Sequence, residues 1–380
     1  MKYLSRNVWI LSGVSLFTDM ASEMLYPVLP VYLKHIGFSM IFIGFLEGFV
    51  EGLSGWSKAY FGHHSDASGK RLPFIRWGYT LSAVSRPLLA FFTYSWWIFL
   101  VRSMDRIGKG IRTGARDAML ADESTTEFRG RVFGFHRSMD TVGAVLGPLL
   151  ALLYLAWFPE DYIRLFYFAL VPGILAVALS FILKANPSLR PNASSDKPGW
   201  FSFIRYWKRS PVAYRKLVVG LLVFAAINSS DVFLLLKIKE AGGNDTLVIG
   251  MYVFYNLVYA GFAFPAGMVA DRIGLRNMYV LGLLCFTAVY LGMSFFAGGS
   301  WVFVLFLVYG LYAAATEGIS KAWIANLVDP HDTATAIGFY TGFQSLSAFL
   351  ASSLTGLIWY QWGSAYAFFF SGITALLVAV

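Results

Sequence analysis

Charge is scarce in this chain. Only 13% of its 380 residues are Asp, Glu, Lys or Arg, whereas a typical soluble domain has about 25%. Cysteine is almost absent as well, because Cys285 is the single cysteine, and this excludes an internal disulfide. Hydrophobic residues make up 57% of the chain and aromatic residues 18%. The composition excludes an ordinary soluble protein and indicates a membrane protein with several spanning helices.

Long apolar runs are abundant. About 20 apolar residues are enough for an α-helix to cross the hydrocarbon core of a bilayer. Twelve such runs are present, near residues 8–33, 38–61, 73–94, 96–120, 130–156, 162–184, 214–236, 246–269, 278–297, 301–326, 335–358 and 364–380. The first run has a basic start, but Asp19 and Glu23 follow and no small-residue cleavage site is present. We therefore expect a first spanning helix there rather than a signal peptide.

Lys and Arg residues are distributed unequally between the predicted loops. Short loops rich in these residues stay on the cytoplasmic side of a membrane. With the N-terminus inside, the inner segments hold Lys2, Arg6, Lys70, Arg71, Arg129, Arg131, Arg272 and Arg276, and the outer loops only Lys34, Arg164, Lys237 and Lys239. We expect a multi-pass protein of the bacterial inner membrane with a cytoplasmic N-terminus. The net charge of +9 then reflects this bias, and no nucleic-acid partner is expected because no basic soluble domain exists.

A polar segment divides the runs into two sets of six. Residues 185–213 are rich in Pro, Ser and Lys and form the predicted cytoplasmic linker between an N-terminal bundle, 1–184, and a C-terminal bundle, 214–380. The two halves also share sequence. "GHHSDASGKR" at 62–71 aligns with "GMVADRIGLR" at 267–276, 205 residues later, and "DAMLAD" at 117–122 aligns with "KAWIAN" at 321–326, 204 residues later. An offset this constant indicates a parallel duplication.

The repeated loop resembles the loop signature of the major facilitator superfamily. The pattern G-x-x-x-D-x-x-G-x-R occurs after the second and the eighth predicted helices, and its defining residues are Gly62, Asp66, Gly69, Arg71, Gly267, Asp271, Gly274 and Arg276. The resemblance spans the whole chain. It implies an all-α membrane protein with twelve transmembrane helices in two pseudo-symmetric six-helix bundles around a central cavity. We expect Asp66 to meet a neighbouring helix N-terminus or an Arg and to latch the halves as a cytoplasmic gate.

The fifth predicted helix carries a second motif, "GFHRSMDTVGAVLGP". Its small residues and proline are Gly134, Gly143, Gly147 and Pro148, and it resembles the antiporter motif of the superfamily's drug/proton exchangers. The glycines that usually close that motif are replaced here by Ala151 and Leu152. Small residues let helix backbones approach closely and proline bends a helix, so we expect a hinge. A general glycine-rich packing face is the alternative.

The fourth predicted helix carries a stripe of charge. At 100° per residue its charged side chains fall within an arc of about 120°. They are Arg102, Asp105, Arg106, Lys109, Arg112 and Arg116. A charge facing lipid at the bilayer centre costs at least about 2.5 kcal/mol, so the stripe must face protein or water. We expect the deeper cations to bind substrate, and Arg112 and Arg116 to serve the cytoplasmic gate with Asp66, Asp122 or Glu123.

Acidic partners for this stripe lie on other predicted helices. Asp19 and Glu23, Glu47 and Glu51, and His136 and Asp140 are each four residues apart, so each pair shares one helix face. The resemblance implies that helices 1, 4, 7 and 10 line the cavity. The proton-coupling candidates are Asp19, Glu23, His136 and Asp140, and the substrate-binding candidates are Arg102, Arg106, Lys109, Asp231 and Glu317.

The predicted function is alternating-access secondary transport of a small charged organic solute, by proton-coupled efflux. Uptake of an organic anion or an iron chelate, and ferroportin-like export of a divalent metal, are the alternatives. We expect no catalysis and no cofactor, since "GKGIRT" at 108–113 lacks the strand and spacing of a phosphate-binding loop and "GHH" at 62–64 lacks further metal ligands. The expected partners are the solute, protons and the lipid bilayer, and the expected oligomeric state is a monomer.

Overall fold

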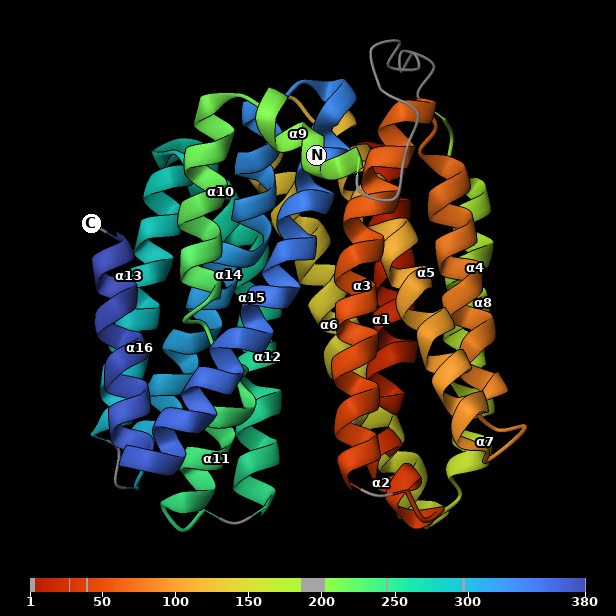
Figure 1. Cartoon of the computed structure of the whole chain (residues 1–380), viewed down its shortest axis with the longest axis vertical. Helices are drawn as coiled ribbons and strands as arrows, with labels where there is room; N and C mark the ends of the chain where they lie inside the picture. The colour runs from red at the N-terminus through yellow and green to blue at the C-terminus, as the bar shows by residue number, and fades with distance from the viewer. Residues whose placement is uncertain are drawn as a thin grey trace. The chain divides into compact units, whose positions relative to one another are not determined.

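The structure is a computed structural model that describes residues 4–26, 28–38, 40–185, 202–243, 245–295 and 298–379. These residues form α-helices joined by short connections, with one 3-10 helix and no strand among them (Figure 1). The helices are α1 (Arg6–Leu25), α2 (Val28–His35), α3 (Met40–Ser68), α4 (Leu72–Leu88), α5 (Ser95–Asp122), α6 (Arg129–Trp157), α7 (Tyr162–Phe168), α8 (Leu170–Ile182), α9 (Ser202–Arg209), α10 (Val212–Ala225), α11 (Val232–Glu240), α12 (Asp245–Ile273), α13 (Leu275–Ser294), α14 (Trp301–Leu327), η1 (Pro330–Asp332), α15 (Thr333–Trp362) and α16 (Ser364–Ala379). The all-α prediction is confirmed.

The twelve predicted runs correspond to these helices, with three of the runs divided. The first run is α1 and α2, the sixth is α7 and α8, and the seventh is α10 and α11. The seventh run was expected to be continuous and is not, because residues 226–231 between its two helices read "AINSSD". Asn, Ser and Asp side chains bind nearby backbone groups and so compete with helical hydrogen bonds. Asp231 therefore lies at the start of α11 and not inside a spanning helix.

The linker contains a helix of its own. Residues 186–201 of the predicted linker, and Val380 at the end of the last run, lie outside the described residues. Within the rest of the linker, residues 202–209 form α9, which contacts α3, and α10 begins at Val212, before the predicted end of the linker. The Trp207 ring stacks on Phe339 of α15, with ring centroids 5.5 Å apart, and Arg209 lies 3.4 Å from Asp332 of η1. The linker is thus anchored to neighbouring helices by aromatic and ionic contacts.

The outer surface of the helices is apolar. Large hydrophobic side chains are widely exposed, among them Leu153 (61%), Trp157 (77%) and Leu377 (72%). Exposed apolar surface on this scale fits contact with lipid and not with water. Among the described residues, five helical segments are long and apolar enough to span a bilayer by length and composition alone: Arg129–Trp157, Tyr162–Ile182, Gly250–Ile273, Leu275–Ser294 and Trp301–Leu327.

The chain forms two compact units whose borders fall inside helices. Unit 1 comprises Met1–Thr125, Met139–Ser210 and Val328–Gly342, and unit 2 comprises Thr126–Ser138, Pro211–Leu327 and Phe343–Val380. The start of α6 is therefore grouped with unit 2 and its remainder with unit 1, while the start of α15 is grouped with unit 1 and its remainder with unit 2. The predicted boundaries near residues 184 and 214 stay a prediction.

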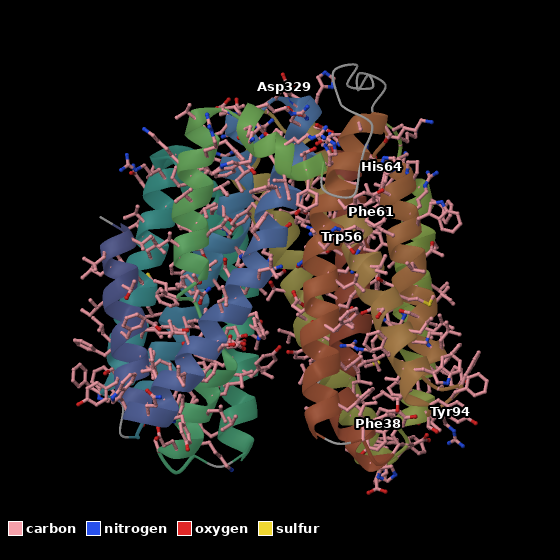
Figure 2. The ribbon with its side chains drawn as sticks, in the orientation of Figure 1. Phe38, Trp56, Phe61, His64, Tyr94 and Asp329 are labelled. Atoms are coloured by element: carbon pink, nitrogen blue, oxygen red, sulfur yellow. The ribbon has the colours of Figure 1, made fainter. Side chains whose placement is uncertain are left out.

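Unit 1 has a well-defined core at one end. Leu29, Leu46, Ile98 and Phe166 bring together side chains of α2, α3, α5 and α7 there. Figure 2 shows Phe38 and Tyr94 at this end of the unit and His64, near the end of α3, at the opposite end. The loop between α3 and α4 therefore lies at the end of unit 1 away from this core.

Glycines bring α1 and α6 close together inside unit 1. A Cβ atom placed on Gly147 would lie 2.5 Å from the Met20 carbonyl oxygen and 2.7 Å from the Met24 nitrogen, which is closer than real Cβ contacts. A Cβ on Gly143 would overlap the Leu16 carbonyl oxygen. Pro148 follows inside the same helix. The two glycines are required for this backbone contact.

Replacing Gly147 with Leu is expected to destabilise the protein by about 1–3 kcal/mol or more, because the side chain has no space beside the α1 backbone. Thermal unfolding of purified protein measures the effect. The matched control is Gly220→Leu on α10, where a Cβ atom meets no neighbour within 4 Å. Equal melting temperatures for the two variants would show that α1 and α6 do not need this close contact.

Candidate functional site

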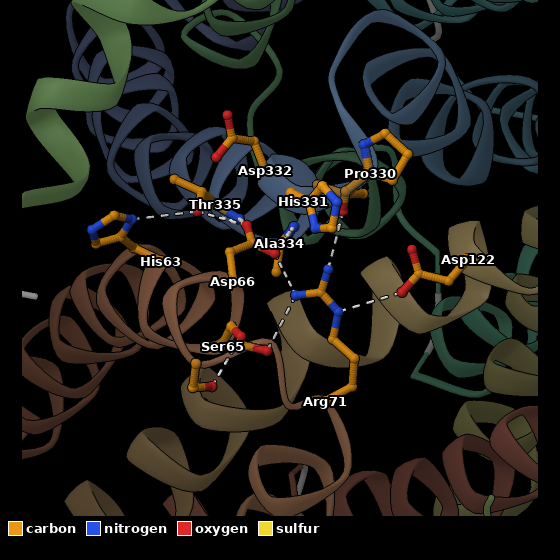
Figure 3. A network of polar contacts seen from close by, with 12 residues as sticks. His63, Ser65, Asp66, Arg71, Asp122, Pro330, His331, Asp332, Ala334 and Thr335 are labelled. Carbon is orange, nitrogen blue, oxygen red and sulfur yellow. Dashed lines mark hydrogen bonds and ion pairs between the residues drawn. The ribbon is translucent and has the colours of Figure 1, made fainter. Parts of the chain in front are cut away.

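Asp66, at the end of α3, binds the first turn of α15. Its carboxylate accepts hydrogen bonds from the Thr335 backbone nitrogen at 2.5 Å, the Thr335 hydroxyl at 2.6 Å and the Ala334 nitrogen at 3.3 Å (Figure 3). The first N–H groups of a helix have no partner within the helix and carry partial positive charge, so a carboxylate is well suited to this position. Asp66 also forms an ion pair with Arg71.

Arg71 holds this arrangement together. Its guanidinium group lies 3.4 Å from Asp122 at the end of α5 and donates a 3.2 Å hydrogen bond to the Pro330 carbonyl (Figure 3). Burial alone would lower the pKa of Arg71, but the Asp66 and Asp122 carboxylates outweigh it and raise this pKa above its ordinary value. Arg71 therefore stays charged and joins α3, α5 and η1. We call Asp66, Arg71 and Asp122, with the start of α15, the first latch.

The second copy of the loop forms an equivalent contact in unit 2. Asp271, near the end of α12, accepts hydrogen bonds from the Gly130 nitrogen at 2.8 Å and the Arg131 nitrogen at 3.1 Å, at the start of α6. Arg131 also supplies the cation, with its Nε 3.1 Å from Asp271, whereas Arg276 is exposed. The second copy of the loop thus keeps the carboxylate and the helix start, but its cation is Arg131 of α6 and not the arginine of the loop itself. Asp271 and the start of α6 form the second latch.

Glycines occupy equivalent places in both latches. Gly69 and Gly274 have φ values of 63° and 93°, which L side chains rarely adopt. A Cβ atom on Gly62 would lie 3.1 Å from the Ala334 carbonyl carbon, and one on Gly267 would lie 2.8 Å from that of Gly130. The loop motif therefore provides both the turn and the close approach of a second helix.

Arg112 and Arg116 were expected to pair with Asp66, Asp122 or Glu123, and the structure gives them other partners. Arg112 donates a 2.7 Å hydrogen bond to Ser82 and lies over the Tyr79 ring, 4.7 Å from its centroid. Arg116 forms an ion pair with Asp117 at 2.9 Å. Arg71 binds Asp66 and Asp122, and Glu123 accepts a hydrogen bond from Asn7, so the expected pairing of these two arginines is corrected. Their role in the gate stays a prediction.

Two carboxyl groups meet between α1 and α6 in unit 1. Asp19 lies within electrostatic range of Asp140, and Asp140 accepts a hydrogen bond from Ser15 of α1. Arg116 donates to the same Ser15 hydroxyl at 3.3 Å. Glu23 and Lys109 lie within electrostatic range of Asp19. Three of the four proton-coupling candidates, Asp19, Glu23 and Asp140, are therefore brought together.

The fourth proton-coupling candidate is His136. It is buried one turn before Asp140 on α6, in the stretch grouped with unit 2. Asp140 is buried as well. The suggested tuning of His136 by Asp140 stays a prediction.

The deeper arginines of α5 are paired with acidic residues. Arg102 lies 2.6 Å from Glu47 of α3, and Arg106 lies 3.9 Å from the same carboxylate. Asp105 is 4.0 Å from Arg102 and 4.0 Å from Arg86 of α4. Lys109 is exposed. We call Arg86, Arg102, Arg106, Glu47 and Asp105 the guanidinium cluster.

Arg86 was missed by the sequence analysis. It is 4% exposed and donates a 2.7 Å hydrogen bond to Ser22 of α1, between Asp19 and Glu23 in the sequence. The signal was available, because an ionisable residue within a predicted spanning helix is a candidate functional residue in itself. Ser15 was missed too, and an isolated Ser in an apolar helix gives no comparable signal.

The candidates from the C-terminal half lie in unit 2. Asp231 accepts a hydrogen bond from the Tyr255 hydroxyl, and Glu317 lies 4.0 Å from Arg137 at the start of α6. Unit 2 also contains buried tyrosines, among them Tyr312, whose hydroxyl accepts a 2.9 Å hydrogen bond from the Asn228 side-chain amide. The proposed meeting of Asp231 and Glu317 with the charged residues of α1 and α5 stays a prediction. Among the described residues no group of three His, Cys, Asp or Glu side chains is placed to hold a metal ion.

Together these features define a class of protein. A bundle of spanning helices with duplicated loops, charged groups inside the helices and close glycine contacts is typical of a secondary transporter. A model of the Major Facilitator Superfamily matches residues 11–254 and 232–380. The chain belongs to this superfamily and is a membrane transporter, not an enzyme.

Individual relatives extend this comparison. An uncharacterised MFS-type transporter of Methanocaldococcus jannaschii, MJ1317, is 31% identical over 94% of this chain and 89% of its own length. The homologue of the multi-drug resistance efflux pump PmrA from Lactococcus lactis is 22% identical over 76% of this chain and 72% of its own length. Among solved structures, the human organic anion transporter MFSD10 has the same fold, with a TM-score of 0.79, 17% identity and 98% of each chain covered.

The two latches differ in their cation, and this predicts unequal effects of equivalent substitutions. Arg71→Gln is expected to destabilise the protein by about 3–5 kcal/mol, because Asp66 and Asp122 lose a buried partner. Arg276→Gln should change stability by less than about 0.5 kcal/mol, since Arg276 is exposed. Denaturant or thermal unfolding of the two purified variants measures the difference. A similar loss in both variants would contradict the assignment of Arg131 as the cation of the second latch.

Proposed function

We propose that the chain couples the movement of protons to the efflux of a small, charged organic solute across the inner membrane of a bacterium. The observation that carries this proposal is the meeting of two acidic residues, Asp19 and Asp140, at the contact between α1 and α6 inside unit 1. Two carboxylates close together repel each other when both are ionised, so this site is suited to binding and releasing a proton. Proton-coupled transport needs such a proton-binding group within the spanning helices.

The proton site is connected to the helix contact that is expected to move. Asp140 lies three residues before Gly143 on α6, and Asp19 lies one residue before Met20 on α1. Gly143 and Gly147 place the α6 backbone against the same stretch of α1. Loss of the proton leaves two negative charges at this contact and favours separation of the helices. Binding and release of the proton would therefore change the packing of α1 on α6.

The two latches would control the same motion at the cytoplasmic side. Asp271 binds the first turn of α6, and Asp140 lies ten residues later, about 15 Å along the same helix. Asp66 likewise binds the first turn of α15, whose remainder belongs to unit 2. Each latch thus holds the start of a helix that continues into the other unit. Opening of the latches and rearrangement at the proton site would then be coupled through continuous helices.

Direction and topology are further parts of the proposal. The basic residues at the latch end of the chain favour a cytoplasmic N-terminus and cytoplasmic latches. The glycine motif of α6 and the Lactococcus lactis relative, which is named as an efflux pump, favour efflux. We propose a monomer as the working unit, since each latch and the proton site are built within one chain.

Replacing Asp19 with Asn should abolish transport driven by a pH gradient, because the variant pair no longer takes up and releases a proton in the same way. The measurement uses everted membrane vesicles that are acidified inside, with ethidium and carboxyfluorescein as cationic and anionic probes. Exchange of probe without a pH gradient should persist in the variant and shows that it is folded. Glu160→Gln, in an exposed loop, is the control. Undiminished gradient-driven accumulation in Asp19→Asn would remove Asp19 from the coupling mechanism.

A further inference from the structure

The guanidinium cluster is short of one negative charge. Three guanidinium groups, those of Arg86, Arg102 and Arg106, share the carboxylates of Glu47 and Asp105. Within the cluster itself the guanidinium groups therefore outnumber the carboxylates by one.

Hydrogen-bond donors of the cluster are also left without acceptors. The Nη1 atom of Arg86, the Nε atoms of Arg102 and Arg106, and the hydroxyl of the adjacent Ser103 are buried and have no hydrogen-bond partner in the structure. A buried donor without an acceptor costs about 1–3 kcal/mol, and more when the donor is charged. The three guanidinium donors all belong to the cluster, and this favours the binding of an acceptor group there.

The cluster is accessible from one side. The Glu47 side chain is 33% exposed, and Lys109, one turn after Arg106, is exposed. Arg86 is buried, and α8 packs closely against α4 there, because a Cβ atom placed on Gly173 would lie 3.2 Å from the Ala83 Cβ and 3.5 Å from the Arg86 Nη1. The cluster is therefore buried at Arg86 and open near Glu47.

We propose that the guanidinium cluster binds the carboxylate group of the transported solute, and that Arg86 is its innermost contact. The proposal rests on the proposed transport function but not on the direction of transport. A carboxylate supplies the missing negative charge and up to four lone-pair positions for the free donors. Arginine suits this task because its planar fork binds two carboxylate oxygens at once.

The test uses the purified full-length chain and three acids of increasing size: acetate, benzoate and 2-naphthoate. Each acid is compared with its uncharged primary amide, and chloride and inorganic phosphate are titrated separately. Isothermal titration calorimetry gives affinity and thermal unfolding gives ligand protection. We expect at least one organic acid to bind and to protect, and its amide, chloride and phosphate to bind at least tenfold more weakly. Failure of all three acids to bind, or equal binding of acid and amide, overturns the proposal. Tighter binding of chloride or inorganic phosphate than of every organic acid also overturns the proposal.

Variants test the role of each charge. Arg86→Gln should weaken acid binding about tenfold or more, and Arg86→Lys should restore part of it. Glu47→Gln should bind the acid more tightly than the wild type, because it removes a competing carboxylate. The matched control is Arg76→Gln on the same helix, whose guanidinium binds the carbonyls of Ser180, Phe181 and Leu183, and it should bind the acid normally.

The acid affinity is expected to rise in Glu47→Gln and to fall in Arg86→Gln. Glu47→Gln therefore tests the proposal even if Arg86→Gln fails to fold. Weaker binding by Glu47→Gln would assign the arginines a purely structural role and overturn the proposal. The proton-coupling proposal is tested separately through Asp19→Asn. If acid binding fails and Asp19→Asn still loses coupling, the inference falls and the proposed function stands.

Discussion

Charge inside spanning helices is the constraint on which unit 1 is built. An ionised side chain facing lipid at the bilayer centre costs at least about 2.5 kcal/mol, and α5 alone carries a stripe of them. The stripe is accommodated because α1, α3 and α4 all contact α5 and present polar groups to it. Glu47 comes from α3, Ser82 from α4 and Ser15 from α1. The charges thus determine which helices neighbour α5.

The repeated loop shows which part of a duplicated element is physically essential. Both copies keep an aspartate that binds the first turn of a helix and glycines that allow the turn and the close approach. The first N–H groups of any helix need acceptors, so this part of the loop answers a requirement that both halves share. The cation is less constrained, since any nearby guanidinium serves. Arg71 supplies it in one copy and Arg131 in the other.

Two different kinds of charged site lie side by side in unit 1. Asp19 and Asp140 are two neighbouring carboxyl groups, which we propose as the proton site, and the guanidinium cluster contains three arginines and two carboxylates. Arg86 connects them, because it binds Ser22 on α1 and lies within electrostatic range of Asp19. Coulomb interactions are strong where water is excluded, so a change of charge at the carboxyl pair alters the attraction of the cluster for an anion. The proposed proton site and the proposed solute site are therefore energetically linked.

The sequence by itself determined the features that depend on local pattern. Apolar runs of membrane length gave the helices, the repeated loop gave the latches around Asp66 and Asp271, and helical spacing gave one charged face on α5, because each of these is set by residues close together in the chain. Only the tertiary structure decided which charges pair. Arg102 binds Glu47 across 55 residues, Arg71 rather than Arg112 or Arg116 binds Asp122, and Arg86 joins α4 to α1. Such pairs form where packing brings distant helices together, and spacing along one helix carries no information about which neighbour it meets.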